Sequence, residues 1–152
     1  METVQYSIDI AAPREIVWDT TIGEESYKEW TKPFEPTSFY RGSWTTGSKI
    51  YFLMRTKEGK ESGMSSEIAE SRRPEFISIR HLGVVENGVE DFTSEAVKTW
   101  APGYENYTLE ESDGGTRFVV DIDVTAEHKA MFEKIWPDAL KKLKALAEAR
   151  AA

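Results

Sequence analysis

The sequence contains no cysteine, no long apolar run and only two histidines. Without cysteine the chain forms no disulfide bonds and offers no thiolate to a metal or a substrate. No stretch approaches the roughly 20 apolar residues that a membrane-spanning helix needs, and the first residues lack a basic region followed by an apolar one. We therefore predict a cytoplasmic protein without a signal peptide or membrane insertion.

Positive charge is also scarce, because 19 lysines and arginines face 27 acidic residues and leave a formal net charge of −8. This balance argues against nucleic acid or an anionic membrane as a partner. The sequence motifs of zinc, calcium, phosphate and dinucleotide sites and of a serine nucleophile are absent. We expect no metal, no cofactor and no catalytic set that the sequence identifies.

Aromatic residues are plentiful, at 12% of the chain with five tryptophans. With 152 residues the chain has the usual size of one domain. Hydrophobic patterning continues from end to end, without a linker or a repeat. We predict a single domain over residues 1–152, in which aromatic side chains fill the core and some line a pocket.

Most of the chain shows the period-two alternation of half-buried strands. This pattern predicts strands over residues 4–10, 50–55, 61–70, 76–85, 104–111 and 118–124, and the aromatic-rich residues 39–44 are expected to form a strand or a turn. Short turn sequences predict hairpins at Glu58-Gly59, Asn87-Gly88 and Asp113-Gly114-Gly115.

Helical signals occur at three places. Two short helices are predicted over residues 13–20 and 24–30, and Ser94 is placed to cap one further helical turn. From Ala126 onward the period becomes helical, with Thr125 as the expected N-cap. The apolar stripe of this long helix consists of Phe132, Trp136, Leu140 and Leu143, and Pro137 predicts a kink or a boundary within it.

These elements predict an α+β fold in which about six to seven antiparallel strands form one curved sheet. A meander of such strands with one apolar face needs a cover. The C-terminal helix is the only element long enough to supply it.

The order of motifs resembles the SRPBCC superfamily, also called START-like or helix-grip proteins. The resemblance spans nearly the whole chain and is carried by Ile10 to Trp18, by Gly63 to Ile68 with Pro74 and residues 76–79, by residues 105–109 with 113–116, and by Trp136 with Ala139, Leu140 and Leu143. Within the superfamily the chain is most similar to bacterial homologues of the domain that activates the ATPase of a heat-shock chaperone. The resemblance implies a cavity between sheet and helix, in which known members bind lipids, sterols, polyketides or other hydrophobic molecules.

Two polar residues are candidates for a role in that cavity. By alternation His81 shares a face with Ile77 and Ile79, and Glu105 shares one with Tyr107. Either residue can orient a ligand or transfer protons, and a hydrogen-bonded core histidine and a carboxylate at an exposed strand end are the competing interpretations. The second histidine, His128, is expected in solvent at the first turn of the long helix.

The predicted cavity wall is apolar. Besides His81 and Glu105 it consists of Trp30, Trp44, Phe52, Met54, Met64, Trp100, Tyr107, Phe132, Trp136 and Leu140. Core packing alone would also explain each of these ten residues.

Three functions compete at this point. The first is non-enzymatic binding of a small hydrophobic molecule such as a lipid, a polyketide or an aromatic metabolite. The second is a protein-interaction module of the co-chaperone type, which requires an exposed apolar patch and a chaperone or other protein as partner. The third is a cyclase or dehydratase that uses His81 and Glu105, which requires these two side chains to converge.

Overall fold

The structure, a computed structural model, describes all 152 residues and consists of eight strands and four helices. In chain order these are β1 (Glu2–Ile10), α1 (Arg14–Ile22), α2 (Glu24–Trp30), β2 (Phe39–Gly42), β3 (Lys49–Arg55), β4 (Glu61–Arg72), β5 (Phe76–Glu86), β6 (Val89–Asp91), α3 (Glu95–Lys98), β7 (Gly103–Ser112), β8 (Gly115–Val124) and α4 (Ala126–Ala151). This order confirms the α+β class.

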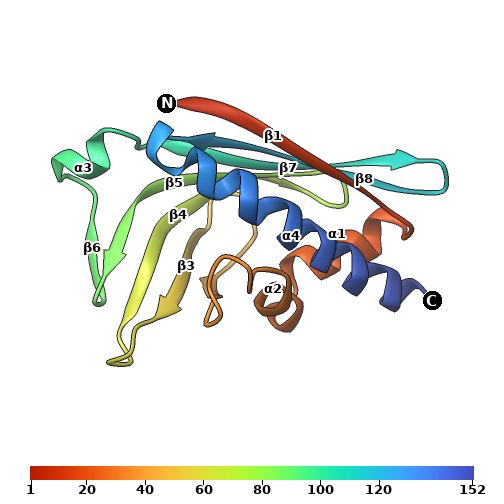
Figure 1. Cartoon of the computed structure of the whole chain (residues 1–152), viewed down its shortest axis with the longest axis horizontal. Coiled ribbons are helices and arrows are strands. Elements are labelled where there is room, and N and C mark those ends of the chain that lie inside the picture. Colours follow the sequence, from red (N-terminus) through yellow and green to blue (C-terminus); the bar gives the residue numbers. More distant parts are fainter.

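The strands form one antiparallel sheet in the order β1-β8-β7-β5-β4-β3-β2, with the short β6 paired to β5 alone. Helix α4 runs across one face of this curved sheet, and α1 and α2 lie beside its C-terminal half (Figure 1). The predicted helix-grip arrangement is therefore confirmed.

The curvature has local causes in β4. Its pairing with β5 shifts register between Ser65 and Ser66 and again between Ile68 and Glu70, and such bulges bend a strand and increase its twist. At Gly63, φ is +152°, and a Cβ there would lie 2.0 Å from the carbonyl oxygen of Phe52. Only glycine permits that close approach of β3 and β4.

The core lies between the concave face of the sheet and the helices. Residues that alternate along the strands, such as Ile77 and Ile79 on β5, are buried in the same core cluster as Trp136, Leu140 and Leu143 of α4. Trp30 at the end of α2 is 1% exposed, and its Nε1–H donates to the carbonyl oxygen of Thr21 at 3.0 Å. This bond satisfies the polar end of a large side chain in the interior.

The local helix predictions have different outcomes. Ser94 caps α3 as expected, because its hydroxyl accepts from the amide of Val97 at 3.3 Å. Thr125 occupies the N-cap position of α4, but its hydroxyl contacts His128 Nδ1 at 2.9 Å instead of a backbone amide.

Pro137 lies inside one continuous helix, so the alternative of a helix boundary is wrong. Pro137 itself is exposed, although Trp136 and Leu140 near it on the helix are buried. The carbonyl that loses its helical partner belongs to the exposed Glu133, where water can bond to it. No helix combines the length and the apolar character needed to cross a lipid bilayer.

The contact between α4 and the sheet can be tested by truncating Leu140, which is 2% exposed in the core. Leu140→Ala should lower the free energy of unfolding by about 2–5 kcal/mol, because it leaves a cavity under the helix. Urea unfolding followed by circular dichroism measures this loss. The matched control Lys141→Ala, on the exposed side of α4, should change stability by less than about 0.5 kcal/mol; equal effects of the two variants would contradict the arrangement.

Candidate functional site

A cavity of about 490 Å³ lies between the concave face of the sheet and the helices α2 and α4. Most of its lining residues are hydrophobic, at 16 of 27. Its aromatic wall comprises eight residues that come from both helices, from two strands and from the loops: Tyr27, Trp30, Phe34, Phe52, Trp100, Tyr107, Phe132 and Trp136. The volume is in the range of small-molecule sites.

All four methionines of the chain also line this cavity. Two of them, Met1 and Met131, are 62% and 44% exposed, so they mark the side on which the cavity opens to solvent. Methionine side chains are flexible and polarisable, and they adapt to ligands of different shape.

The polar part of the cavity is a chain of four hydrogen-bonded side chains from three adjacent strands. Ser66 Oγ lies 2.6 Å from His81 Nδ1, and His81 Nε2 lies 3.0 Å from Glu105 Oε1. The hydroxyl of Tyr107 donates to the other oxygen, Glu105 Oε2. We call these four residues the polar chain.

Strand register explains why these residues meet. Ser66 on β4 pairs directly with His81 on β5, while Glu105 on β7 pairs with Ile79, two residues before His81. Residues two apart on a strand share a face, so His81 and Glu105 are diagonal neighbours on the concave side. The bulge next to Ser66 brings that hydroxyl into line with the imidazole.

The polar chain fixes the hydrogen-bond roles of the imidazole. A carboxylate only accepts, so His81 Nε2 carries a hydrogen and donates to Glu105. In the neutral ring Nδ1 then accepts from the Ser66 hydroxyl. Ser66 is fully buried, whereas the side chains of His81 and Glu105 remain 12% and 14% exposed. Ser66 therefore orients the ring, and the histidine and the carboxylate reach the cavity.

Burial also changes the titration of the phenols around Glu105. Desolvation raises the pKa of Tyr107 well above its ordinary value of 10, and the charge on Glu105 raises it further. The pKa of Tyr27, whose ring lines the same cavity, is raised by the same two causes in the same order. Both phenols are thus held in the protonated form that donates hydrogen bonds.

Aromatic rings surround the polar chain on the cavity side. The ring of Phe52 lies 5.8 Å from that of His81, and Trp30 lies 6.3 Å from Tyr107, both in edge-on geometry. Trp136 contacts Phe34 edge-on at 4.9 Å. The indole N–H of Trp136 is buried and has no partner within the protein.

Most of the residues predicted from sequence lie at this cavity. The residues His81, Glu105, Trp30, Phe52, Met54, Met64, Trp100, Tyr107, Phe132 and Trp136 all line it. Trp44 and Leu140 do not, because both are packed within the core cluster. Their role in binding was predicted from aromatic character or helical spacing. Such a pattern indicates which face of an element a side chain lies on, but not how deeply that side chain is buried.

Sequence reasoning missed other lining residues. Tyr27 and Thr31 flank Trp30 at the end of α2, and Phe34 follows in the loop. The spacing of three between Tyr27 and Trp30 was a usable signal for Tyr27. Phe34 stands between two prolines with no periodicity, so nothing local marks it. His128, expected only in solvent, also borders the open side.

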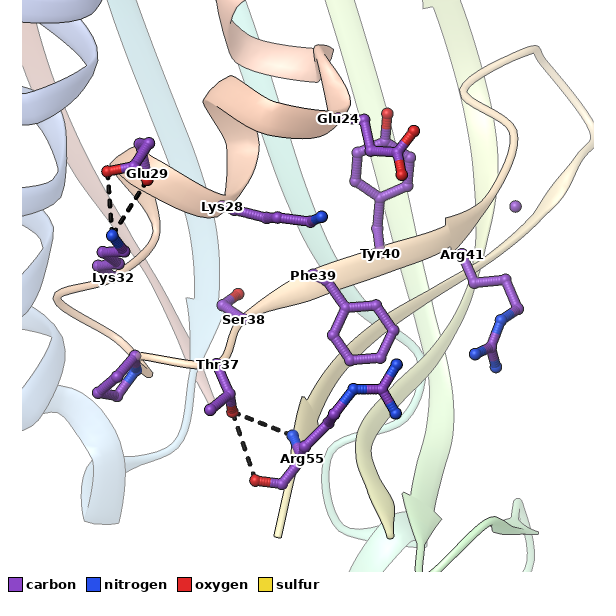
Figure 2. Close-up of a pocket in the computed structure, with 12 residues that line it drawn as sticks. Glu24, Lys28, Glu29, Lys32, Thr37, Ser38, Phe39, Tyr40, Arg41 and Arg55 are labelled. Atoms are coloured by element: carbon purple, nitrogen blue, oxygen red, sulfur yellow. Dashed lines mark hydrogen bonds and ion pairs between the residues drawn. The ribbon is translucent and has the colours of Figure 1, made fainter. Parts of the chain in front are cut away.

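A second hollow, an open groove of about 710 Å³, lies on the outside between α2 and β2 (Figure 2). Four cationic side chains border it: Lys28, Lys32, Arg41 and Arg55. Each of them already forms an ion pair with a glutamate, and all four side chains are more than a third exposed. Exposed pairs of this kind contribute little energy, and Arg41 and Arg55 share the one carboxylate of Glu61.

The sheet, the long covering helix and the aromatic cavity between them define a protein of the helix-grip class. The chain belongs to the family of Activator of Hsp90 ATPase homolog 1-like proteins, whose model matches residues 11–148. This match confirms the resemblance that the sequence motifs indicated. No curated protein matches the chain.

Solved structures of similar proteins share the fold at low identity. Protein NE0264 from Nitrosomonas europaea is 18% identical with a TM-score of 0.73, over 97% of this chain and 95% of that one. The Aha1 dimer from Colwellia psychrerythraea is 17% identical with a TM-score of 0.71, over 97% of both chains. DynU16, a protein in the dynemicin biosynthetic locus, is 16% identical with a TM-score of 0.68, over 99% of this chain and 49% of that one.

The raised pKa of Tyr107 predicts a loss of stability in alkali. A phenol whose folded-state pKa is raised stabilises the fold below its unfolded value of about 10, and this contribution is lost as pH rises above that value. Tyr107→Phe should therefore reduce the slope of unfolding free energy against pH, between about pH 10 and 12, by up to about 1.4 kcal/mol per pH unit. Urea unfolding at stepped pH measures the slope.

Tyr27→Phe should reduce the same slope, since burial raises the pKa of that phenol too. The double variant should show the sum of the two effects. A Tyr107→Phe profile parallel to that of the wild type would contradict the burial of a neutral phenol at this site.

Proposed function

We propose that this protein binds a small hydrophobic molecule in the cavity between the sheet and α4. The observation that carries the proposal is the cavity itself: about 490 Å³, walled by eight aromatic residues and four methionines around a few convergent polar groups. A mostly apolar hollow with few fixed polar groups is the usual form of a small-molecule site. Side chains that served only the core would fill this space, because interiors pack without large voids.

The polar groups give such a ligand defined contacts. The oxygens of Glu105 accept one hydrogen bond each from the protein, and a carboxylate has about four acceptor positions. The unpartnered N–H of Trp136 is a buried donor on a lining residue. Leaving such a donor unpaired costs about 1–3 kcal/mol, so a ligand oxygen that reached it would gain affinity.

Catalysis by His81 and Glu105 is a second candidate, because the two side chains meet at 3.0 Å beside the cavity. Their convergence fulfils the geometric condition for acid–base chemistry. Both imidazole nitrogens, however, are already engaged, by Ser66 and by Glu105. Proton transfer to a ligand would require one of these bonds to break, and this favours binding over turnover.

A co-chaperone role follows only from the names of the family and of the similar Aha1 protein from Colwellia psychrerythraea. It calls for a contiguous exposed apolar patch. The large apolar side chains that are exposed are Met1, Val89, Phe92 and Met131, and two of these, Met1 and Met131, belong to the cavity mouth. The surface therefore favours the cavity over a docking face.

Filling the cavity tests the proposal. N-phenyl-1-naphthylamine, a neutral apolar dye that fluoresces on leaving water, should bind to the wild-type protein. Met64→Trp places a larger side chain on β4 in the cavity wall, so the dye should bind at least about tenfold more weakly, a change of about 1.4 kcal/mol. Fluorescence titration measures both affinities.

The matched control is Val89→Trp, an equally large side chain on the exposed β6, which should leave the affinity unchanged. Circular dichroism would establish that both variants are folded. Native mass spectrometry of protein purified from its own host should in addition show a bound mass that Met64→Trp reduces. A dye affinity unaffected by Met64→Trp would show that the dye does not use this cavity and would overturn the proposal.

A further inference from the structure

Apart from the two histidines His81 and His128, the charged side chains around the cavity have one sign only. Its 27 lining residues include three carboxylates, those of Glu35, Glu105 and Asp123, but no lysine and no arginine. Glu35 and Asp123 bond to nearby hydroxyl or amide groups, Thr37 for the first and Thr3 and Tyr104 for the second. Glu105 is the carboxylate that belongs to the polar chain on the concave face.

Glu105 has no permanent cation as a partner. Its only ion-pair partner is His81, which carries charge only when protonated, and Tyr107 donates from a neutral hydroxyl. Two neutral donors stabilise a carboxylate but leave its net negative charge in place. Whenever the imidazole carries no proton in excess, a largely apolar space thus contains an uncompensated negative charge.

The protein's own phenols respond to this charge. Burial is the main cause that raises the pKa of Tyr107 and of Tyr27, and Glu105 is the second cause at both. The field of the carboxylate therefore reaches across the cavity to the ring of α2 as well as to its neighbour on β7. A positive group placed in the same space would be favoured by that field.

The aromatic wall adds to this preference. Trp30 contacts Tyr107, and Phe52 contacts His81, so ring systems border both ends of the His81–Glu105 pair. Aromatic faces attract cations, and the attraction grows where water is excluded. A carboxylate beside several rings is the arrangement that recognises an organic ammonium group.

We propose that the cavity selects hydrophobic molecules that carry a protonated amine, which bonds to the free acceptor positions of Glu105, and that it discriminates against fatty acids and other apolar anions. This inference rests on the proposed function and adds the chemical class of the ligand. An apolar carboxylic acid of the same size would meet a like charge and find no lysine or arginine in the lining. A neutral alcohol would keep the hydrogen bond to Glu105 but lose the charge interaction.

Three probes with the same ring system test the proposal: 2-(1-naphthyl)ethylamine, 2-(1-naphthyl)ethanol and 1-naphthylacetic acid. At about pH 8 an alkylamine is protonated. Calorimetric titration of the wild-type protein should give affinities in the order amine, alcohol, acid, with a gap of about tenfold between amine and alcohol. Equal affinities, or tighter binding of the acid, would overturn the amine preference.

Glu105→Gln removes the charge while it keeps the shape of the side chain. It should weaken the amine about tenfold and leave the alcohol within about twofold, so that the gap between them closes. Glu110→Gln, the same substitution at an exposed position of the same strand, should leave all three affinities unchanged.

The probes also separate the two proposals. If the alcohol binds and Met64→Trp weakens it, but the amine gains nothing over the alcohol, the cavity is a hydrophobic site and the amine inference is wrong. If no probe binds even at about millimolar concentration, where a cavity of this size should be occupied, both proposals are wrong. The comparison on the wild-type protein decides the amine preference even if Glu105→Gln does not fold.

Discussion

The contact between Trp136 and the elements around it connects the rest of the structure. Its ring lies 6.3 Å from Tyr6 on β1, 6.1 Å from Trp30 on α2, 4.9 Å from Phe34 in the following loop and 6.4 Å from Tyr107 on β7. One side chain of α4 thus contacts both the sheet and α2. Large aromatic side chains suit this role because each buries much apolar area at little entropic cost.

The same packing leaves the cavity open. Toward the C-terminus of α4, Ala139, Leu143 and Ala147 are fully buried, and two of them are small enough for the helix to approach its neighbours closely. Toward the N-terminus the helix presents Phe132 and Met131, which border the cavity instead of filling it. The cavity therefore lies under the N-terminal half of α4, which borders it with Phe132 and Trp136, whereas the fully buried residues of the C-terminal half do not line it.

Periodicity in the sequence predicted much of the fold and part of the site. Alternation placed His81 and Glu105 on the concave face because side-chain direction in a strand has a period of two. It could not provide Ser66 as the group that orients His81, since that contact depends on a bulge and on the register between β4 and β5. Periodicity could not distinguish Trp44, which is packed in the core, from Trp30, which borders the cavity. A local pattern does not record how far a side chain lies from the cavity.

The polar chain places charged and polar side chains among the aromatic residues of the core. A carboxylate among aromatic residues with no permanent cation costs stability, and an apolar residue of similar size would pack there without that cost. Ser66, His81 and Tyr107 offset part of it by hydrogen bonds, and together they hold the carboxylate in one orientation toward the cavity. Such departures from an otherwise consistent core are expected where a protein recognises a ligand. Because the four residues come from three strands in fixed register, the sheet that encloses the cavity also sets the position of the charged group on its concave face.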